Sequence, residues 1–198
     1  MSDIFDKIAF DDERHPYLQS GEPDNRIEKQ TAGNLFKYFR DPSHTIPKSS
    51  VNALKDALDV NEYDDMFPQY LGPIYRGMIV STEQLRSFGF DPNGVIIGDM
   101  QRTQCTYTTK HGYSSWSSSA GIAKQFSVPE ALGGFGKYNG PETEEQLYGI
   151  VLTADASKYK GFTLDGWYFA VDGVNSVEQE VFILEKRITV QSITVTWK

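Results

Sequence analysis

Apolar and polar positions divide the chain into three stretches. Residues 1–24 are mostly polar and are punctuated by proline and glycine, which is typical of an extended N-terminal arm. In residues 25–71, apolar side chains recur at helical intervals, so we expect helices there. In residues 72–198, short apolar runs alternate with turns. The sequence therefore predicts an α+β fold in which the helices come first and a sheet follows.

The same pattern assigns individual elements. Apolar residues at helical spacing run from Val51 to Leu58, and Ser49 or Ser50 is positioned to cap that helix. The other expected elements are short helices at 82–88 (capped by Ser81) and 119–126, a surface loop at 133–146, and strands at 74–80, 105–109, 112–117, 146–154, 177–184 and 188–197.

Composition narrows the classes of protein that fit this pattern. The 198 residues, with 12 Phe, 11 Tyr and 3 Trp, suffice for one folded domain. We place it at residues 25–198, with a helical part at 25–71 and a mainly β part at 72–198. The formal net charge of -8 would repel a phosphate backbone at long range, so the charge does not indicate a nucleic-acid partner. The net charge does not exclude a local basic groove that binds nucleic acid.

Cysteine, histidine and hydropathy narrow the classes further. Cys105 is the single cysteine and cannot form an internal disulfide, and with three histidines it provides no zinc-ligand spacing, so no metal is expected. No apolar run has the length of a signal peptide or a membrane helix. We therefore expect a cytoplasmic protein without a membrane partner. A phage-derived protein or a delivered effector would reach a host cytoplasm and look the same, because such routes need no cleavable signal.

Arg76 is a charged residue within the apolar run at residues 74–80. A guanidinium in a buried strand needs an anionic partner, which either a bound ligand or a carboxylate of the protein can supply. For one isolated arginine a structural ion pair is a sufficient explanation. Arg76 alone therefore does not decide between a binding site and a structural role.

A serine cluster precedes the helix expected at residues 119–126. By strand alternation, the hydroxyls of Ser115 and Ser117 share one face and Trp116 points to the other. Serines are common at strand ends and helix caps, and Ser118 and Ser119 are explained well enough by capping. The first two serines are the candidates for a site.

Two acids open the strand expected at residues 177–184. If that strand is extended, Glu178 and Glu180 point to one face, and Gln179 and Val181 point to the other. Two carboxylates on one face of a core strand cost stability unless that face opens into a polar cleft. The alternative is that the strand has only begun to enter the core and both acids are solvated.

In this order the three motifs resemble the Arg-Ser-Glu class of mono-ADP-ribosyltransferases, which includes bacterial toxins and transferases of T-even bacteriophages. The resemblance covers residues 72–198. Tyr75-Arg76-Gly77 matches an aromatic-Arg-Gly strand, SWSSSAGIAKQF a Ser-x-Ser element with its helix, and EQEVFIL a Glu-x-Glu strand. Trp116 departs from the family, which usually has Thr there. The resemblance implies a two-sheet β core with an NAD cleft.

The resemblance also implies residue roles. NAD would be a consumed substrate, and Glu180 would be the catalytic carboxylate that contacts the ribose and stabilises oxocarbenium character. Ser115 would hold that carboxylate, with support from Ser117. Arg76 would grip the NAD pyrophosphate through charge-assisted hydrogen bonds, and Gly77 would let its backbone approach the nicotinamide amide.

The acceptor follows from the same comparison. Glu178 resembles the catalytic residue that engages the acceptor in arginine-modifying members, so arginine side chains of a host protein are the expected acceptor. The loop at residues 165–176 would recognise that protein. Its aromatic residues Trp167, Tyr168 and Phe169 either face the partner or pack in the core.

The sequence leaves other functions open. An NAD glycohydrolase, in which water replaces the acceptor, would carry the same motifs, as would a transferase acting on RNA, DNA or another side chain. A non-catalytic binding module would pair its Arg and Glu with each other. His111-Gly112 superficially resembles the first element of poly-ADP-ribosylating relatives, but it follows the arginine motif and crowds the serines.

Overall fold

The computed structural model describes residues 34, 38, 45–59, 69–141, 145–163 and 179–198. The chain forms two compact units, one made of Met1–Pro68 with Gly166–Asn175 and the other of Gln69–Asp165 with Ser176–Lys198. We call them the N-terminal unit and the β unit. Their boundary lies close to the division expected between a helical part and a β part, and the single domain at residues 25–198 stays a prediction.

The helices and strands of the described residues follow in chain order, with η for a 3-10 helix. They are α3 (Lys48–Asp59), β1 (Pro73–Ser81), α4 (Thr82–Ser87), β2 (Met100–Arg102), β3 (Thr106–Thr108), β4 (Ser114–Ser117), α5 (Ala120–Phe126), η2 (Glu130–Leu132), β5 (Leu147–Asp155), η3 (Ala156–Lys158), β6 (Gly161–Thr163), β7 (Glu180–Ile183), β8 (Arg187–Thr189) and β9 (Ser192–Trp197).

Helix α3 belongs to the N-terminal unit and confirms the helix expected from Val51 onward. The side chain of Val51 is buried. The predicted cap is wrong. The helix begins at Lys48, ahead of both serines, and the carbonyl of Pro47 accepts the first helical hydrogen bond from the Val51 N–H at 3.1 Å. Ser50 is buried inside the helix, where its hydroxyl accepts a hydrogen bond from Asn34 Nδ2 at 3.0 Å, so it is not free to cap.

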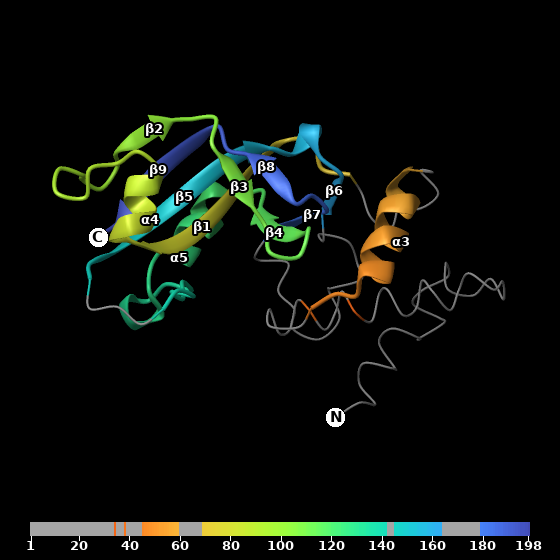
Figure 1. The fold of residues 1–198 in the computed structure, drawn as a ribbon, viewed down its shortest axis with the longest axis horizontal. Coiled ribbons are helices and arrows are strands. Elements are labelled where there is room, and N and C mark those ends of the chain that lie inside the picture. Colours follow the sequence, from red (N-terminus) through yellow and green to blue (C-terminus); the bar gives the residue numbers. More distant parts are fainter. Residues whose placement is uncertain (1–33, 35–37, 39–44, 60–68, 142–144, 164–178) are drawn as a thin grey trace, which may run out of the picture. The chain divides into compact units, whose positions relative to one another are not determined.

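The β unit contains a seven-stranded sheet, in the order β2-β9-β5-β1-β4-β7-β6, and the two-stranded sheet β3-β8 among its described residues. Every pairing between these strands is antiparallel. Figure 1 shows the long strands β1, β5 and β9 side by side, with β3 and β8 crossing in front of them. The α+β class with two sheets is therefore confirmed.

The large sheet has two halves that meet at a narrow junction. Strands β1 and β5 pair along their whole lengths, from Pro73 opposite Asp155 onward. Strands β1 and β4, in contrast, are in register at one pair, Tyr75 opposite Ser117. The half β2-β9-β5-β1 is thus joined to the half β4-β7-β6 through this pair, and we call the region the β1–β4 junction.

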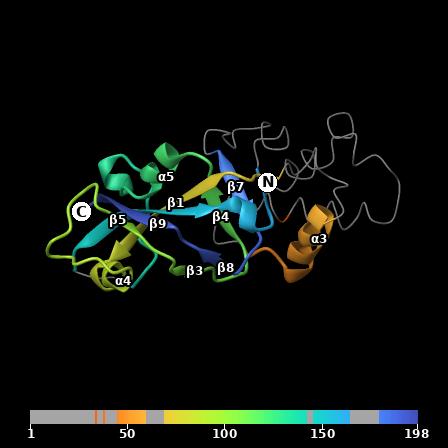
Figure 2. The same cartoon turned by 90° about the horizontal axis from the view of Figure 1, so that it is seen from above.

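Different elements cover the two faces of the sheet. In Figure 2, α5 lies over one face, and α4 with the β3-β8 pair lies against the other. The face covered by α4 and the β3-β8 pair carries the main hydrophobic core, which includes Ile74, Leu152, Ile193 and Trp116, and we call it the core face. We call the face covered by α5 the α5 face. Residues directly opposite across antiparallel strands share a face, so the register assigns neighbouring side chains to one side or the other.

Both short helices of the β unit begin where the sequence predicts. Ser81 caps α4 in a reciprocal arrangement with Gln84, and Ser119 caps α5 by accepting a hydrogen bond from the Ile122 N–H. The run at residues 188–197, expected as one strand, is split. Its first part forms β8 with β3, and its second forms β9 between β5 and β2. Alternation alone cannot reveal this change of sheet.

Candidate functional site

The three sequence motifs lie on three neighbouring strands, β1, β4 and β7. Tyr75 on β1 is opposite Ser117 on β4, and Ser117 is opposite Glu180 on β7. The three residues therefore form one row across the β1–β4 junction. The fold therefore brings the three motifs, which are far apart in the sequence, next to one another in the sheet.

The serine motif has the predicted orientation. Ser115 is opposite Phe182 and Ser117 is opposite Glu180, so both serines share the face of Glu180. Trp116 is opposite Val181, on the core face. The Ser117 hydroxyl is buried and accepts a hydrogen bond from the Ser119 N–H at 3.0 Å. The end of β4 and the start of α5 are thereby fixed to each other next to Glu180.

The strand that carries the acids is shorter than predicted. Strand β7 begins at Glu180, and Gln179 has a φ of 45°, in the left-handed region that non-glycine residues seldom adopt. Its carbonyl accepts hydrogen bonds from the Ser118 N–H at 2.8 Å and the Ser118 hydroxyl at 3.2 Å. The expectation that Glu178 and Glu180 share a strand face assumed extended backbone at Gln179, which the structure does not have. Glu178 itself lies outside the described residues.

Arg76 has the surroundings of a binding group. Its Nη1 donates a hydrogen bond to the main-chain carbonyl of Ser115, and its guanidinium lies over the ring of Tyr107, with 5.4 Å between Cζ and the ring centroid. Its Nε is buried and has no hydrogen-bond partner among the residues that the structure describes. Among the described residues no carboxylate forms an ion pair with Arg76. The structural ion pair that would have explained this arginine is therefore absent from that part of the chain.

Arg76 and Glu180 leave the sheet on opposite faces. Tyr75 shares the α5 face with Ser117 and Glu180, so Arg76, the next residue along β1, points to the core face. Two contacts agree with this assignment. Leu152, opposite Arg76 on β5, is fully buried in the core, and Tyr107 packs against both Arg76 and Trp116.

Gly77 is required for packing. A Cβ atom at this position would lie 1.8 Å from the Ala123 carbonyl oxygen, so α5 rests directly on the backbone of β1. Gly149 on β5 does the same for the Ser127 carbonyl, at 2.1 Å. Contact with α5 therefore explains the glycine at position 77, and its expected role toward nicotinamide stays a prediction.

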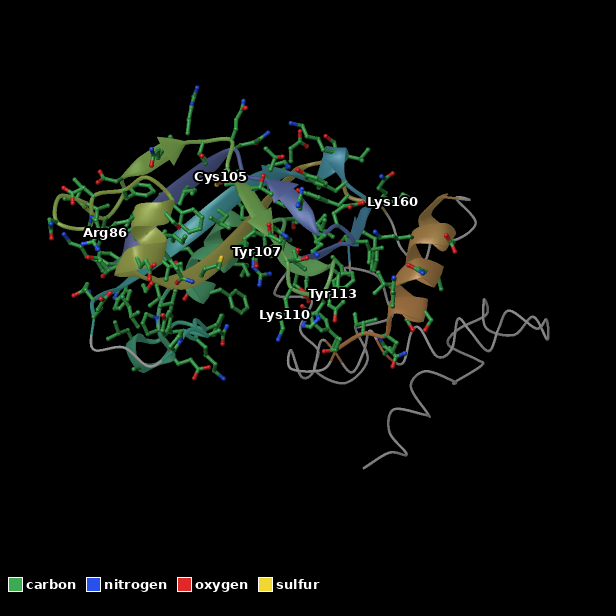
Figure 3. All side chains as sticks on the ribbon, in the orientation of Figure 1. Arg86, Cys105, Tyr107, Lys110, Tyr113 and Lys160 are labelled. Atoms are coloured by element: carbon green, nitrogen blue, oxygen red, sulfur yellow. The ribbon has the colours of Figure 1, made fainter. Side chains whose placement is uncertain are left out.

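Tyr107 was not singled out by the sequence. It stands in an ordinary alternating run on β3, and its contact with Arg76 joins two strands that belong to different sheets. Figure 3 shows Tyr107 projecting from β3 near the middle of the β unit. A tyrosine within a short alternating strand carries no signal of such a contact, because the pairing depends on how the sheets cross.

Some of the predictions concern residues outside the described ranges, and others concern ligands. The loop at 165–176, with Trp167, Tyr168 and Phe169, lies outside the described residues. Within the described ranges, no helix is long and apolar enough to cross a membrane, and no three His, Cys, Asp or Glu side chains gather as a metal site would need. The NAD cleft stays a prediction.

Comparison with known proteins gives distant likenesses. No family model and no curated protein matches the chain. Among solved structures it is similar to the ADP-ribosyltransferase Vis in complex with M6 inhibitor, with 19% identity over 92% of this chain and 63% of that one and a TM-score of 0.38. It is also similar to the Vis toxin from Vibrio splendidus, with 18% identity, 92% and 63% coverage and a TM-score of 0.36.

A third solved structure, of Vis in complex with agmatine, shows 18% identity over 99% of this chain and 79% of that one, with a TM-score of 0.35. The chain spans 63% of the length of the first two structures. Likenesses this distant do not assign the chain to a family.

Proposed function

We propose that the chain is a mono-ADP-ribosyltransferase that consumes NAD, releases nicotinamide and transfers ADP-ribose to arginine side chains of a host protein. The observation that supports this most is the row of Tyr75, Ser117 and Glu180 on neighbouring strands. The three motifs that resemble the Arg-Ser-Glu class would be scattered if the resemblance were accidental. Instead they meet at one junction of the sheet.

The surroundings of Arg76 fit a substrate with a pyrophosphate. The guanidinium is half-buried, and within the described part of the chain its Nε has no partner and no carboxylate neutralises it. A desolvated cation is costly unless an anion approaches it, and planar guanidinium groups bind phosphate oxygens through paired hydrogen bonds. The pyrophosphate of NAD supplies such an anion. Arg76 would therefore bind this part of the substrate.

Glu180 is suited to the other end of the same substrate. Its carboxylate is half-buried at the start of β7, beside Ser117 and on the face of Ser115. Breaking the bond between nicotinamide and ribose develops positive charge on the ribose, which a fixed carboxylate stabilises more in the transition state than in the ground state. Ser115 would hold the carboxylate, and Ser117, directly opposite, would support it.

The reaction balances without any further reagent. The bond from ribose C1′ to the nicotinamide nitrogen breaks, and nicotinamide leaves as a neutral molecule with the bonding electrons. A nitrogen of the acceptor guanidine forms the new bond to C1′ and loses a proton. Glu178 would hold the incoming guanidinium and take up that proton before it passes to water.

The opposite directions of Arg76 and Glu180 limit where NAD can bind. One molecule can contact both side chains only if it passes from the core face to the α5 face. At the β1–β4 junction the two halves of the sheet share one registered pair, so this is where we place such a passage. We therefore propose that NAD binds beside Ser115, whose carbonyl Arg76 already contacts.

The test is to incubate the protein with NAD and agmatine and to measure nicotinamide, free ADP-ribose and ADP-ribosyl-agmatine by mass spectrometry. We expect nicotinamide and ADP-ribosyl-agmatine to appear together. Free ADP-ribose without the agmatine adduct would identify an NAD glycohydrolase. Nicotinamide release together with ADP-ribose attached to added RNA or DNA, and not to agmatine, would mean that nucleic acid is the acceptor. No nicotinamide release with any acceptor would contradict the proposal.

A further inference from the structure

We propose that Tyr107 is a positioning residue that fixes the orientation of the Arg76 guanidinium, and that Trp116 holds Tyr107 in place. This inference rests on the proposed function, because its consequence is measured through NAD. It extends the site to a strand of the second sheet, β3, which carries none of the three motifs.

Two contacts restrict the Arg76 guanidinium. The hydrogen bond from Nη1 to the Ser115 carbonyl holds one end of the group, and Cζ lies over the Tyr107 ring, 5.4 Å from the ring centroid. That distance is within the range of a cation–π interaction, which is stronger where water is excluded. A guanidinium held by both contacts keeps a defined direction for its remaining N–H groups, including Nε, which has no partner among the described residues.

Tyr107 is itself held by Trp116. The two rings meet edge to face, with centroids 5.8 Å apart and an interplanar angle of 89°, a favourable geometry for aromatic pairs. Trp116 is buried, and its Nε1 donates a 2.8 Å hydrogen bond to the Ser114 hydroxyl, so the indole has a fixed orientation. On β3, Tyr107 is opposite the fully buried Ile188 of β8. The tyrosine ring therefore has little freedom to move away from Arg76.

This arrangement connects the serine motif to the arginine motif. Trp116 stands between Ser115 and Ser117 but points to the core face, where it meets Tyr107. Trp116 therefore lies on the same face of the sheet as Arg76, and the two serines lie on the same face as Glu180. A single short strand, β4, supports both ends of the proposed NAD site.

The first test is to measure NAD binding by titration calorimetry and steady-state kinetics for Tyr107→Leu and Tyr107→Phe. Loss of the ring should weaken NAD binding about tenfold and raise KM by a similar factor, with kcat changed by less than about twofold, because pyrophosphate binding is the same in the ground and transition states. Tyr107→Phe keeps the ring and should bind NAD like the wild type. A structural role alone would not separate KM from kcat in this way.

The matched control is Tyr159→Leu. Tyr159 is a half-buried tyrosine that packs against the same hydrophobic core, and its hydroxyl accepts a 2.7 Å hydrogen bond from the Thr189 N–H. Its replacement should lower the melting temperature without weakening NAD binding in the protein that remains folded. Equal losses of NAD affinity in Tyr159→Leu and Tyr107→Leu would overturn the positioning role.

A double-mutant cycle tests whether Tyr107 acts through Arg76. In an Arg76→Ala background, Tyr107→Leu should weaken NAD binding no further. If Tyr107→Leu does not fold, trifluorophenylalanine at position 107 retains the shape of the ring but removes its negative face, and it should bind NAD more weakly than Tyr107→Phe. Wild-type affinity in that protein, or in folded Tyr107→Leu, would overturn the inference and leave the proposed function standing. No NAD binding by the wild type would overturn both.

Discussion

The guanidinium of Arg76 donates a hydrogen bond from Nη1 to the main-chain carbonyl of Ser115. The arginine motif and the serine motif are therefore in direct contact across the β1–β4 junction, although one side chain points to the core face and the other to the α5 face. Because the acceptor is a carbonyl and not a carboxylate, the positive charge of Arg76 is not neutralised by this bond. Among the described residues, none supplies a carboxylate that pairs with this charge.

Replacing Arg76 with lysine should weaken NAD binding and raise KM by roughly tenfold or more. Lysine keeps the charge but loses the planar fork that contacts the Ser115 carbonyl and, in the proposed complex, would contact phosphate oxygens as well. Isothermal titration and steady-state kinetics measure the change. Arg86→Lys is the control, because Arg86 is exposed on α4 and lies well away from Tyr107 in Figure 3. Unchanged kinetics in Arg76→Lys would move the pyrophosphate contact elsewhere, with Arg86 and Arg102 as the next candidates.

Gly77→Ala should destabilise the protein by about 1–3 kcal/mol, because the added Cβ would lie 1.8 Å from the Ala123 carbonyl and α5 would have to move. Urea denaturation measures the free energy of unfolding. Gly121→Ala is the matched control within α5, where a Cβ meets only the Ser119 hydroxyl at 3.7 Å. That change should be neutral or stabilising by about 0.5–1 kcal/mol. Equal stability of Gly77→Ala and the wild type would mean that α5 does not rest on β1.

Glu178→Gln should separate transfer from hydrolysis. The substitution removes the charge that would pair with the incoming guanidinium, but it leaves Arg76, Ser115 and Glu180 to bind and cleave NAD. Formation of ADP-ribosyl-agmatine should therefore fall much further than release of free ADP-ribose, when both are measured on one preparation. Parallel loss of the two products would assign Glu178 to NAD cleavage. Unchanged transfer would mean that other groups hold the acceptor.

Local features of the fold could be predicted from the sequence, and contacts between distant segments could not. Alternation along β4 assigned Ser115 and Trp116 to opposite faces correctly, because a strand period of two is a property of the backbone. The cap at Ser119 was likewise predictable from a serine before a helical run. These predictions required no knowledge of neighbouring strands.

Two features of the site could not be predicted from the sequence, for physical reasons. The left-handed conformation of Gln179 interrupts the alternation. Ser118, which lies just after β4 and far away in the sequence, hydrogen-bonds to it, so the sequence around Gln179 gives no signal of this conformation. The contact between Tyr107 and Arg76 depends on how the small sheet crosses the large one. Neither propensity nor periodicity carries that information.

The most direct test of the account is nicotinamide release by Glu180→Gln, compared with the wild type and with Glu185→Gln. Glu185 is a half-buried glutamate that follows the same strand and shares no row with the serine motif, so it controls for loss of one carboxylate nearby. We predict that Glu180→Gln binds NAD and keeps its melting temperature but releases nicotinamide roughly 100-fold more slowly or worse, with and without agmatine, because the charge that stabilises the ribose is gone. Glu185→Gln should resemble the wild type. More than about a tenth of wild-type nicotinamide release by folded Glu180→Gln would contradict the assignment of this site as the one that cleaves NAD.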